Sequence, residues 1–233
     1  MQFFEDILLA APAIEAKLGY TFRDRSHLAL AFIHRSYVNE HRGIDKHNER
    51  LEFLGDSILG LIIAEYLYRE LPSVPEGDLS YLRSRLVEAS SCVAYMQKLD
   101  LGHYLLLGKG EKRNDGRGRS SILADLFEAI IGAIYIDGGL SAAYDFIFNN
   151  FTPEIQAILK EPLRNWKAIL QDYCQRHYQQ TPDYVVLDET GPDHSKIFTI
   201  SVQINNKEVG KGTGSSKKEA QQAAASDAIS RLQ

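Results

Sequence analysis

The sequence predicts a multidomain protein in which an all-α domain is followed by a small α+β domain with the element order α-β-β-β-α. Apolar residues recur at helical spacing through the first two thirds of the chain. A turn-rich interruption at Lys160-Glu161-Pro162 then breaks the pattern, and beyond it apolar and polar residues alternate as in half-buried strands. We therefore expect an all-α domain over residues 1–155, a linker over 156–163 and an α+β domain over 164–233.

The composition is that of an ordinary soluble globular protein, since 44% of the 233 residues are apolar and 24% are charged. Cys92 and Cys174 stand outside any CxxC or Cys/His cluster, which favours a reducing compartment and argues against structural zinc. Residues 1–6 include acids where a signal peptide needs bases. The longest apolar run, Ile58–Ala64, is far shorter than the ~20 residues of a membrane span. We expect a cytoplasmic protein with no membrane segment.

The net charge of −5 is unevenly distributed. Residues 1–163 hold 17 basic and 23 acidic side chains, a balance of −6, whereas residues 164–233 hold 9 and 8, a balance of +1. Composition alone does not indicate a nucleic-acid partner. A metal ion bound to an acidic site in the first segment would reduce its repulsion toward phosphate.

The first helices are expected over residues 10–18 and 25–39, the second with Leu28, Phe32 and Tyr37 near helical spacing. His34 lies within the second stretch. A histidine there could serve as a ligand or a base, but a hydrogen-bonded structural role is more common and is the interpretation we favour.

Residues 47–67 predict a helix whose apolar side chains cover most of its circumference, as in the centre of a helical domain. Glu49, Glu52 and Asp56 nevertheless fall within an arc of roughly 60°. Most acidic triplets are solvated helix faces, but here the flanking residues leave little surface to solvate. Such a stripe needs cations or protonation to relieve it. Gly55 is unfavourable in a helix interior, which predicts a close approach by a neighbouring element.

A turn-rich break at residues 71–78 precedes a predicted helix over Leu79–Lys98, which Asp78 or Ser80 can cap. Residues 109–119 then read as a Gly-rich basic loop, and it lacks the spacing of a P-loop. This loop could hold phosphates, and an ordinary solvated loop is at least as consistent with the pattern.

Residues 120–135 predict a second apolar helix with acids. Asp125 and Glu128 are three residues apart and therefore share a face. Two apolar helices that each carry a carboxylate face favour a common site. Asp137-Gly138-Gly139 should end this helix, and residues 140–151 should form another.

The α+β domain is predicted to contain one helix, three strands and a final helix. Trp166 to His177 is amphipathic, and residues 184–187, 198–204 and 208–212 read as strands, with Asn205-Asn206 as a hairpin turn. Ser216 and Glu219 form a capping box that opens an alanine-rich helix.

Three stretches carry a family resemblance. Asn48 to Ser57, reading NERLEFLGDS, resembles the signature of the ribonuclease III family of double-stranded-RNA endonucleases, and residues 120–135 are similar to the second acidic motif of that family. The stretch GTGSSKKEA at residues 212–220, with the α-β-β-β-α order, resembles the double-stranded-RNA-binding domain. One departure is Ala168, where that domain more often has Thr or Ser.

The resemblance implies a metal-dependent endonuclease and assigns roles to individual residues. It implies Mg²⁺ as the cofactor, with Mn²⁺ as a substitute and no organic cofactor, and double-stranded RNA and a second copy of the chain as partners. It implies processing of RNA such as rRNA and mRNA precursors, with 5′-phosphate and 3′-hydroxyl ends. The residues are metal ligands Glu52, Asp56, Asp125 and Glu128; catalytic or supporting acids Glu49, Asp56, Glu76 and Glu128; RNA contacts Gln171, Gln175, His194, Lys217 and Lys218; and Phe53 at the dimer interface.

Two other functions remain alternatives. A non-catalytic RNA-binding protein on an inactive nuclease scaffold would lack part of the carboxylate set, but all six family positions are acidic here. A nuclease that acts on DNA is disfavoured by the final domain, which the family uses to sense A-form geometry and 2′-hydroxyls.

Overall fold

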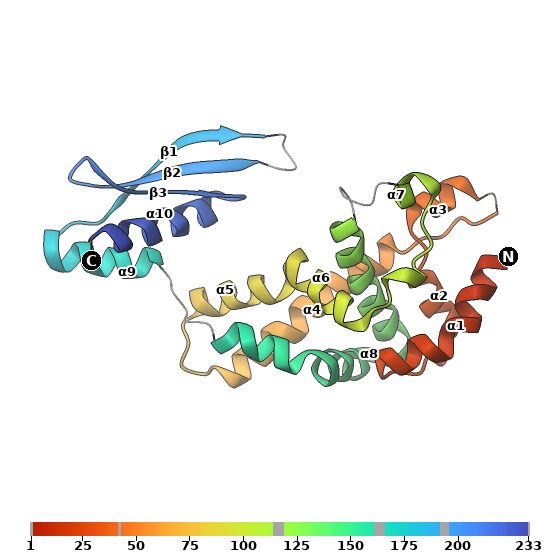
Figure 1. Ribbon diagram of the computed structural model, residues 1–233. Coiled ribbons are helices and arrows are strands. Elements are labelled where there is room, and N and C mark those ends of the chain that lie inside the picture. The colour runs from red at the N-terminus through yellow and green to blue at the C-terminus, as the bar shows by residue number, and fades with distance from the viewer. Residues whose placement is uncertain (1, 42, 114–118, 161–165, 192–195, 233) are drawn as a thin grey trace. The chain divides into compact units, whose positions relative to one another are not determined.

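The computed structural model describes residues 2–41, 43–113, 119–160, 166–191 and 196–232. The chain divides into two compact units, residues 1–161 and 162–233. The first unit is helical and the second combines helices with a sheet (Figure 1). None of the described helices is long and apolar enough to cross a membrane. The elements of the first unit are α1 (Gln2–Leu18), α2 (Arg25–Ala31), α3 (Arg35–Glu40), α4 (Glu49–Glu70), α5 (Glu76–Val87), α6 (Ala89–Leu99), the short 3₁₀ helix η1 (Gly102–Tyr104), α7 (Lys109–Arg113) and α8 (Arg119–Lys160).

The helix predicted over residues 25–39 is in fact two helices, α2 and α3. The chain between them forms an isolated parallel bridge in which Ile33 pairs with Leu106. The Leu106 amide donates to the Phe32 carbonyl at 2.8 Å, and the His34 amide donates to the Leu106 carbonyl at 3.1 Å. These long-range bonds replace the intrahelical ones, so the prediction of one helix was wrong.

The helix predicted over residues 79–98 is likewise divided. Helix α5 begins at Glu76, directly after Pro75 in extended conformation, so Glu76 is helical and neither Asp78 nor Ser80 caps the helix. Glu88 then has an extended ψ of 155° and its carbonyl accepts from the Ser91 and Cys92 amides, which starts α6. The apolar pattern predicts one continuous helix, but the structure has two helices that are divided at Glu88.

Helix α8 is bent at Gly139, whose φ of 80° and ψ of −175° are not helical. The predicted end near residues 137–139 is thus a sharp kink, which glycine permits because it has no Cβ. Helix then continues to Lys160, so residues 156–160 of the predicted linker 156–163 are helical, and the division between the two units lies within the predicted range. Ile158 and Leu159 pack against the core and hold these last turns in place.

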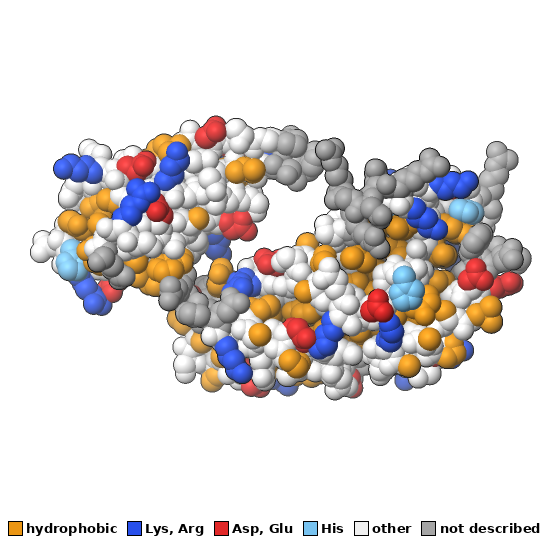
Figure 2. All heavy atoms as spheres, viewed as in Figure 1, with side chains coloured by type: hydrophobic (Ala, Val, Ile, Leu, Met, Phe, Trp, Pro, Cys, Tyr) orange, Lys and Arg blue, Asp and Glu red, His pale blue; other side chains and the backbone are white. Residues whose placement is uncertain are grey.

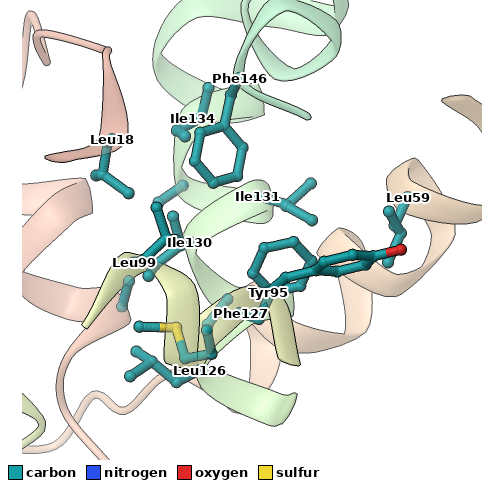
Figure 3. Close-up of a cluster of buried hydrophobic side chains, with 14 of the residues drawn as sticks. Leu18, Leu59, Tyr95, Leu99, Leu126, Phe127, Ile130, Ile131, Ile134 and Phe146 are labelled. Carbon is teal, nitrogen blue, oxygen red and sulfur yellow. The ribbon is translucent and has the colours of Figure 1, made fainter. Parts of the chain in front are cut away.

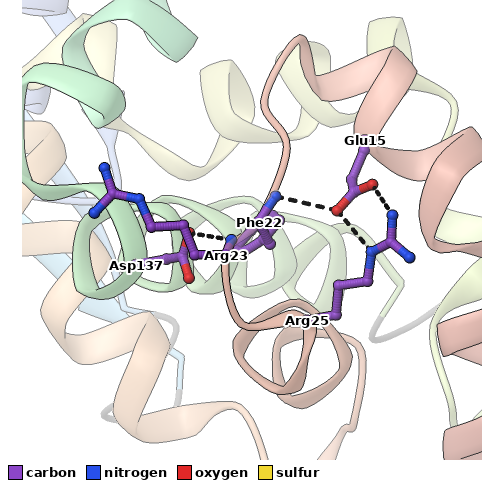
Figure 4. Close-up of polar contacts among 5 residues, drawn as sticks. All are labelled: Glu15, Phe22, Arg23, Arg25 and Asp137. Carbon is purple, nitrogen blue, oxygen red and sulfur yellow. Dashed lines mark hydrogen bonds and ion pairs between the residues drawn. The ribbon is translucent and has the colours of Figure 1, made fainter.

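A hydrogen-bonded network joins the kink of α8 to the segment between α1 and α2 (Figure 4). Asp137 accepts hydrogen bonds from the Tyr20 hydroxyl at 2.6 Å and from the Arg23 and Asp24 amides at 2.9 and 2.8 Å. Nearby, the buried Glu15 accepts two bonds from Arg25 and one from the Phe22 amide. Both carboxylates therefore fix a turn that has few backbone bonds of its own.

The core of the helical unit is built around the first half of α8. Leu126, Phe127, Ile130, Ile131 and Ile134 are all fully buried. Figure 3 shows these side chains gathered with residues from α1, α4, α6 and the second half of α8. The labelled partners are Leu18, Leu59, Tyr95, Leu99 and Phe146. Since helix α8 is packed on several sides, its few polar side chains are held in fixed directions.

Helices α4 and α8 make the most extensive contact in this unit, and two glycines allow it. A Cβ built on Gly55 would overlap the carbonyl oxygen of Glu128, and one built on Gly132 would overlap the carbonyl oxygen of Leu51. The predicted close approach at Gly55 is therefore confirmed. The two backbones touch directly at the level of the acidic residues.

The second unit has the predicted order of elements. Helix α9 (Trp166–Tyr178) is followed by β1 (Asp183–Thr190), β2 (Ile197–Ile204), β3 (Lys207–Gly214) and α10 (Lys217–Leu232). The strands form an antiparallel sheet in the order β1-β2-β3, and Asn205 and Asn206 both have positive φ at the hairpin turn. Alanines of α10 let this helix lie against β3, where a Cβ on Gly212 would overlap the Ala224 amide.

Prediction at the helix crossing. We expect Gly55→Ala to lower the free energy of unfolding of the helical unit by about 2–4 kcal/mol, because the methyl group must separate α4 from α8. Gly60→Ala, in the same helix with no atom within 4 Å of the added Cβ, should instead stabilise by ~0.5–1 kcal/mol. Urea unfolding followed by far-ultraviolet circular dichroism measures both. Equal effects of the two substitutions would contradict a backbone contact at Gly55.

Candidate active site

Three carboxylates from two helices meet in the helical unit. Glu52 projects from α4, and Asp125 and Glu128 project from α8. One oxygen from each lies within 4.8 Å of the others, and all three side chains are partly buried. Among the described residues, this is the group of acidic, histidine or cysteine side chains whose spacing suits a metal ion.

The backbone contact between α4 and α8 sets this spacing. Gly55 lies one turn after Glu52 on α4 and meets the backbone of Glu128 itself. Asp125 and Glu128 lie one turn apart on α8 and point to the same side. The site therefore depends on the two glycines as much as on the acids.

Burial and mutual repulsion raise the pKa of these carboxyl groups. The pKa of Glu52 rises to about 7, first because of burial and then because of the charges on Asp125, Glu49 and Asp56. The pKa of Glu128 also rises to about 7, from burial and then from Asp56 and Asp125. The pKa of Asp125 is raised by burial and by Glu49. Without a cation, Glu52 and Glu128 therefore keep their protons in part near neutral pH, which lowers the repulsion within the cluster.

Asp56 lies at the edge of the cluster. Its side chain is exposed and is not part of the group within 4.8 Å. Its charge nevertheless acts on both Glu52 and Glu128. Asp56 is therefore an exposed acid within electrostatic range of the cluster and not one of its three members.

Glu49 and Glu76 take other positions. Glu49 pairs with Arg35, whose Nη1 lies 3.1 Å from its Oε1, and His47 Nδ1 lies 3.7 Å from its Oε2. Glu76 is exposed at the start of α5 and accepts a hydrogen bond from Ser80 at 2.8 Å. Neither belongs to the three-carboxylate group within this chain. Arg35 was not singled out from the sequence, because α3 and α4 meet only in the fold.

Two other residues near the site have structural roles. His34 Nδ1 lies 2.7 Å from Ser36 Oγ and accepts from the Ser36 amide, so it caps α3 as the favoured interpretation expected. Cys92 is fully buried beside the acids, and burial raises the pKa of its thiol to about 12. A neutral thiol at this position adds no negative charge to the cluster.

The donor set suits a hard divalent cation. Carboxylate oxygens are the ligands that Mg²⁺ prefers, and Mg²⁺ takes few of them while keeping several waters. Three half-buried acids with raised pKa values gain from such an ion both charge compensation and ligation. The residues present therefore fit a magnesium-type site.

Phe53 borders a groove on the helical unit. Its ring is 78% exposed, although it lies next to Glu52 on the central helix. The groove beside it has a volume of about 810 Å³ and is lined by His27, Leu30, Asp45, Lys46, His47, Glu49, Arg50, Leu51, Phe53, Leu54 and Ile136. An exposed aromatic ring beside a partly apolar groove is typical of an interaction surface.

The predicted RNA contacts of the second unit are displayed at its surface. Lys217 and Lys218 are exposed at the start of α10, and Lys217 Nζ lies 5.6 Å from the centre of the Phe198 ring. The Glu219 amide donates to Ser216 Oγ at 3.2 Å, which confirms half of the capping box; the Glu219 carboxylate instead accepts from Ser215. Gln171 and Gln175 are exposed one turn apart on α9. His194 lies outside the described residues.

Charges of both signs are interspersed on the surface. Figure 2 shows basic and acidic side chains alternating over both units on the face in view. The stretch 109–119 is not simply a loop, since α7 occupies Lys109–Arg113; residues 114–118 lie outside the described residues. Affinity for a polyanion would thus come from local groups such as the start of α10 and not from overall charge.

Clustered carboxylates in a helical unit, followed by an α-β-β-β-α unit with exposed lysines at its final helix, are the arrangement expected from the sequence for an endonuclease that acts on double-stranded RNA. Comparison with protein families then identifies the chain. A profile described as Ribonuclease-III-like matches residues 24–155, and the Double-stranded RNA binding motif matches residues 166–232. The chain belongs to the ribonuclease III family.

Similar proteins match most or all of the chain, and a solved domain matches its helical part. Ribonuclease 3 of Protochlamydia amoebophila is 69% identical over 233 residues, which cover 100% of this chain and 96% of that protein. Ribonuclease 3 of Natranaerobius thermophilus is 44% identical over 219 residues, or 94% of this chain and 95% of that protein. A solved nuclease domain of ribonuclease III from Campylobacter jejuni, described as flexible in a region involved in dimer formation, is 39% identical with a TM-score of 0.54. It covers 60% of this chain, and the match includes 96% of that domain.

Prediction for the carboxylate cluster without metal. The pKa of Glu128 is about 7 in the folded chain, against an ordinary value of 4.5 that represents the unfolded chain. As the pH rises from about 4.5 to 7, the unfolded chain loses this proton more readily than the folded chain does. The free energy of unfolding therefore falls over this pH range. Glu128→Gln removes this loss. With chelator present, the variant should therefore exceed wild type by about 1–2 kcal/mol at pH 8, after allowance for partial exposure, and match it near pH 4.

Urea unfolding at the two pH values measures this difference. Glu65→Gln, which removes the partner of Arg69 on the exposed end of α4, is the matched control and should change stability little at either pH. Millimolar Mg²⁺ should stabilise wild type more than Glu128→Gln. A Glu128→Gln variant that is less stable than wild type at pH 8 would contradict the electrostatic account.

Prediction for the start of α10. Replacing Lys217 and Lys218 with Ala should reduce the slope of log K against log[salt] for duplex RNA by up to ~2, with a similar loss for unrelated duplex sequences. Lys207→Ala is the control, because Lys207 begins β3 at the opposite end of that strand from Gly214 and the start of α10. Filter binding with a cleavage-inactive chain measures the slopes. An unchanged slope in the double variant would remove these lysines from the RNA contact.

Proposed function

We propose that this endonuclease cleaves double-stranded RNA by Mg²⁺-assisted phosphodiester hydrolysis, with Mn²⁺ able to substitute and no organic cofactor. The observation that carries the proposal is the meeting of Glu52, Asp125 and Glu128 within 4.8 Å on the two helices that share the central backbone contact. Asp56, at the solvent side, is proposed as the fourth ligand. Glu49 and Glu76 are proposed as supporting acids, because they lie outside the cluster in this chain.

The protein groups have separate tasks in this reaction. Bound Mg²⁺ supplies an activated water and relieves the charge that develops on the phosphate. Glu52, Asp125 and Glu128 would hold the ion in place, and because their pKa values are raised they would release protons on becoming ligands. We propose that Asp56, which is exposed, lies on the side of the site that the RNA approaches. We propose 5′-phosphate and 3′-hydroxyl products.

The second unit is proposed to hold the duplex. Lys217 and Lys218 would neutralise phosphates, while Gln171 and Gln175 on α9, with His194, would meet the minor groove. Contacts of this kind position a duplex without reading its sequence. The chemistry therefore resides in the helical unit and much of the affinity in the second.

The active form is proposed to be a homodimer. An isologous interface places the same patch of both copies in contact. An exposed ring of one copy can then pack into the adjacent groove of the other, and the reverse, across a two-fold axis. Phe53 and its groove have this arrangement. The dimer would also bring two cleavage sites to one duplex.

The cellular role is proposed to be the maturation of rRNA and mRNA precursors in the cytoplasm. Two buried free cysteines, Cys92 and Cys174, suit a reducing compartment. An inactive RNA-binding scaffold is disfavoured because the acids still form a cluster that suits a metal. A DNA substrate is disfavoured by the double-stranded RNA binding motif.

Prediction for the chemistry. Glu128→Gln should lower cleavage of a labelled RNA duplex in millimolar Mg²⁺ by at least about 100-fold and leave duplex binding within a factor of two, because it removes a charged ligand at nearly constant volume. Single-turnover cleavage and equilibrium binding are measured on the same preparation. Glu65→Gln should cleave as wild type does. Near-normal cleavage by Glu128→Gln would remove this residue from the site.

Prediction for the dimer. Phe53→Ala should weaken self-association by at least about tenfold, since it removes a large exposed apolar anchor, while the fold changes little. Tyr68→Ala is the matched control, because Tyr68 is also an exposed aromatic on α4 but does not line the groove. Light scattering across a dilution series measures both. A fully active monomer of wild type at assay concentration would contradict the proposed dimer.

A further inference from the structure

Arg35 is a cationic side chain next to the carboxylate cluster that the proposed mechanism does not use. It is the first residue of α3 and reaches across to α4, where its Nη1 lies 3.1 Å from Glu49 Oε1. The side chain remains 64% exposed. One edge of the guanidinium is therefore engaged by protein, and the remaining donors are open to a ligand.

The position of this pair relative to the cluster follows from α4. Glu49 lies one turn before Glu52, so the two side chains are neighbours on the same face, about 5 Å apart along the helix axis. The charge on Glu49 acts on both Glu52 and Asp125. Arg35 pairs with Glu49, so its guanidinium lies about one side-chain length further than Glu49 from the carboxylates that would hold the metal.

The backbone that carries Arg35 is fixed to α4 by bonds that do not involve its side chain. The Asn48 amide donates to the Ile33 carbonyl at 2.9 Å, and the buried Asn48 side chain donates to the Ala31 carbonyl at 3.2 Å. On the other side, the Gly108 amide donates to Ser36 Oγ at 2.9 Å. Arg35 is therefore presented from an anchored segment at the N-terminal end of α4.

Stability gives little reason for this arrangement. An exposed Arg–Glu pair contributes only ~0–1 kcal/mol to folding. By contrast, Arg presents a planar fork of donors that matches phosphate oxygens and is less costly to desolvate than Lys. A guanidinium oriented by a carboxylate, one turn from a metal-type site, is well placed for the RNA backbone.

We propose that Arg35 is a positioning residue that binds a backbone phosphate next to the scissile one, with Glu49 orienting its guanidinium. The inference rests on the proposed hydrolysis at Glu52, Asp125 and Glu128. Arg35 contributes no proton and no metal ligand. It fixes the register of the strand, so that the reacting phosphate lies over the carboxylates. Glu49 thereby acts through Arg35, which accounts for its place outside the cluster.

The first experiment compares Arg35→Gln with Arg69→Gln by single-turnover cleavage of a labelled RNA duplex in Mg²⁺. Arg69 is the matched control, because it forms an Arg–Glu pair at the other end of α4 and is 68% exposed. We expect Arg35→Gln to slow cleavage by about 10–100-fold and Arg69→Gln to stay within a factor of two. Equal effects in the two variants would overturn the proposal. Arg35→Lys, which keeps the charge but not the fork, should fall between wild type and Arg35→Gln, and it serves also if Arg35→Gln unfolds.

The second experiment separates phosphate binding from mere neutralisation of Glu49. In a Glu128→Gln background, Arg35→Gln should reduce the slope of log K against log[salt] for duplex RNA by about one, and Arg69→Gln should not. The double variant Arg35→Gln/Glu49→Gln should cleave as slowly as Arg35→Gln alone. Recovery to the rate of Glu49→Gln would show that Arg35 only compensates Glu49, and would overturn the proposal. Failure of wild type to cut in Mg²⁺, or cutting by Glu128→Gln, would instead overturn the proposed function.

Discussion

The site depends on one constraint, the direct backbone contact between α4 and α8 at Gly55 and Gly132. A side chain larger than hydrogen at either position would meet a main-chain carbonyl of the other helix, at Glu128 or at Leu51. Helices that are separated by side chains usually lie about 8–10 Å apart, and the two glycines let α4 and α8 come into direct contact at the level of Glu52 and Glu128. The packed residues of α8 then prevent the helices from separating, because any shift opens cavities in the core. The geometry of the carboxylate cluster and the packing of the core are therefore both set by the same crossing.

The same crossing imposes an electrostatic cost. Glu52 and Glu128 are brought into a partly buried place beside Asp125, and the pKa values of all three rise. Carboxylates that repel one another without a metal are suited to bind a cation. The cluster therefore lowers the free energy of unfolding of the metal-free protein and favours cation binding. Arg35 adds a positive charge only at the margin, where it compensates Glu49 without occupying the place of the ion.

Much of this site could be predicted from the sequence, because its signals are local. Glu52 lies on an apolar helix with a glycine three residues later, and Asp125 and Glu128 share a face of a second such helix; both patterns held in the structure. The features that could not be predicted from the sequence depend on contacts between residues that are distant in the chain. The pairing of Ile33 with Leu106 interrupts an apparently continuous helical pattern, and the ion pair of Arg35 with Glu49 joins residues whose proximity no periodicity records. The final turns of α8 lie within the predicted linker, because in the sequence the charged residues next to Pro162 mask the helical spacing of the partly buried Ile158 and Leu159.

Binding of Mn²⁺ to Gly55→Ala, measured by electron paramagnetic resonance beside wild type and Gly60→Ala, tests this account most directly. If the backbone contact sets the spacing of the carboxylates, the folded Gly55→Ala chain should bind Mn²⁺ at least about tenfold more weakly than wild type, because the methyl group moves Glu52 away from Glu128. Gly60→Ala should bind as wild type does. A folded Gly55→Ala chain with wild-type affinity for Mn²⁺ would contradict the central claim that the crossing of α4 and α8 builds the metal site.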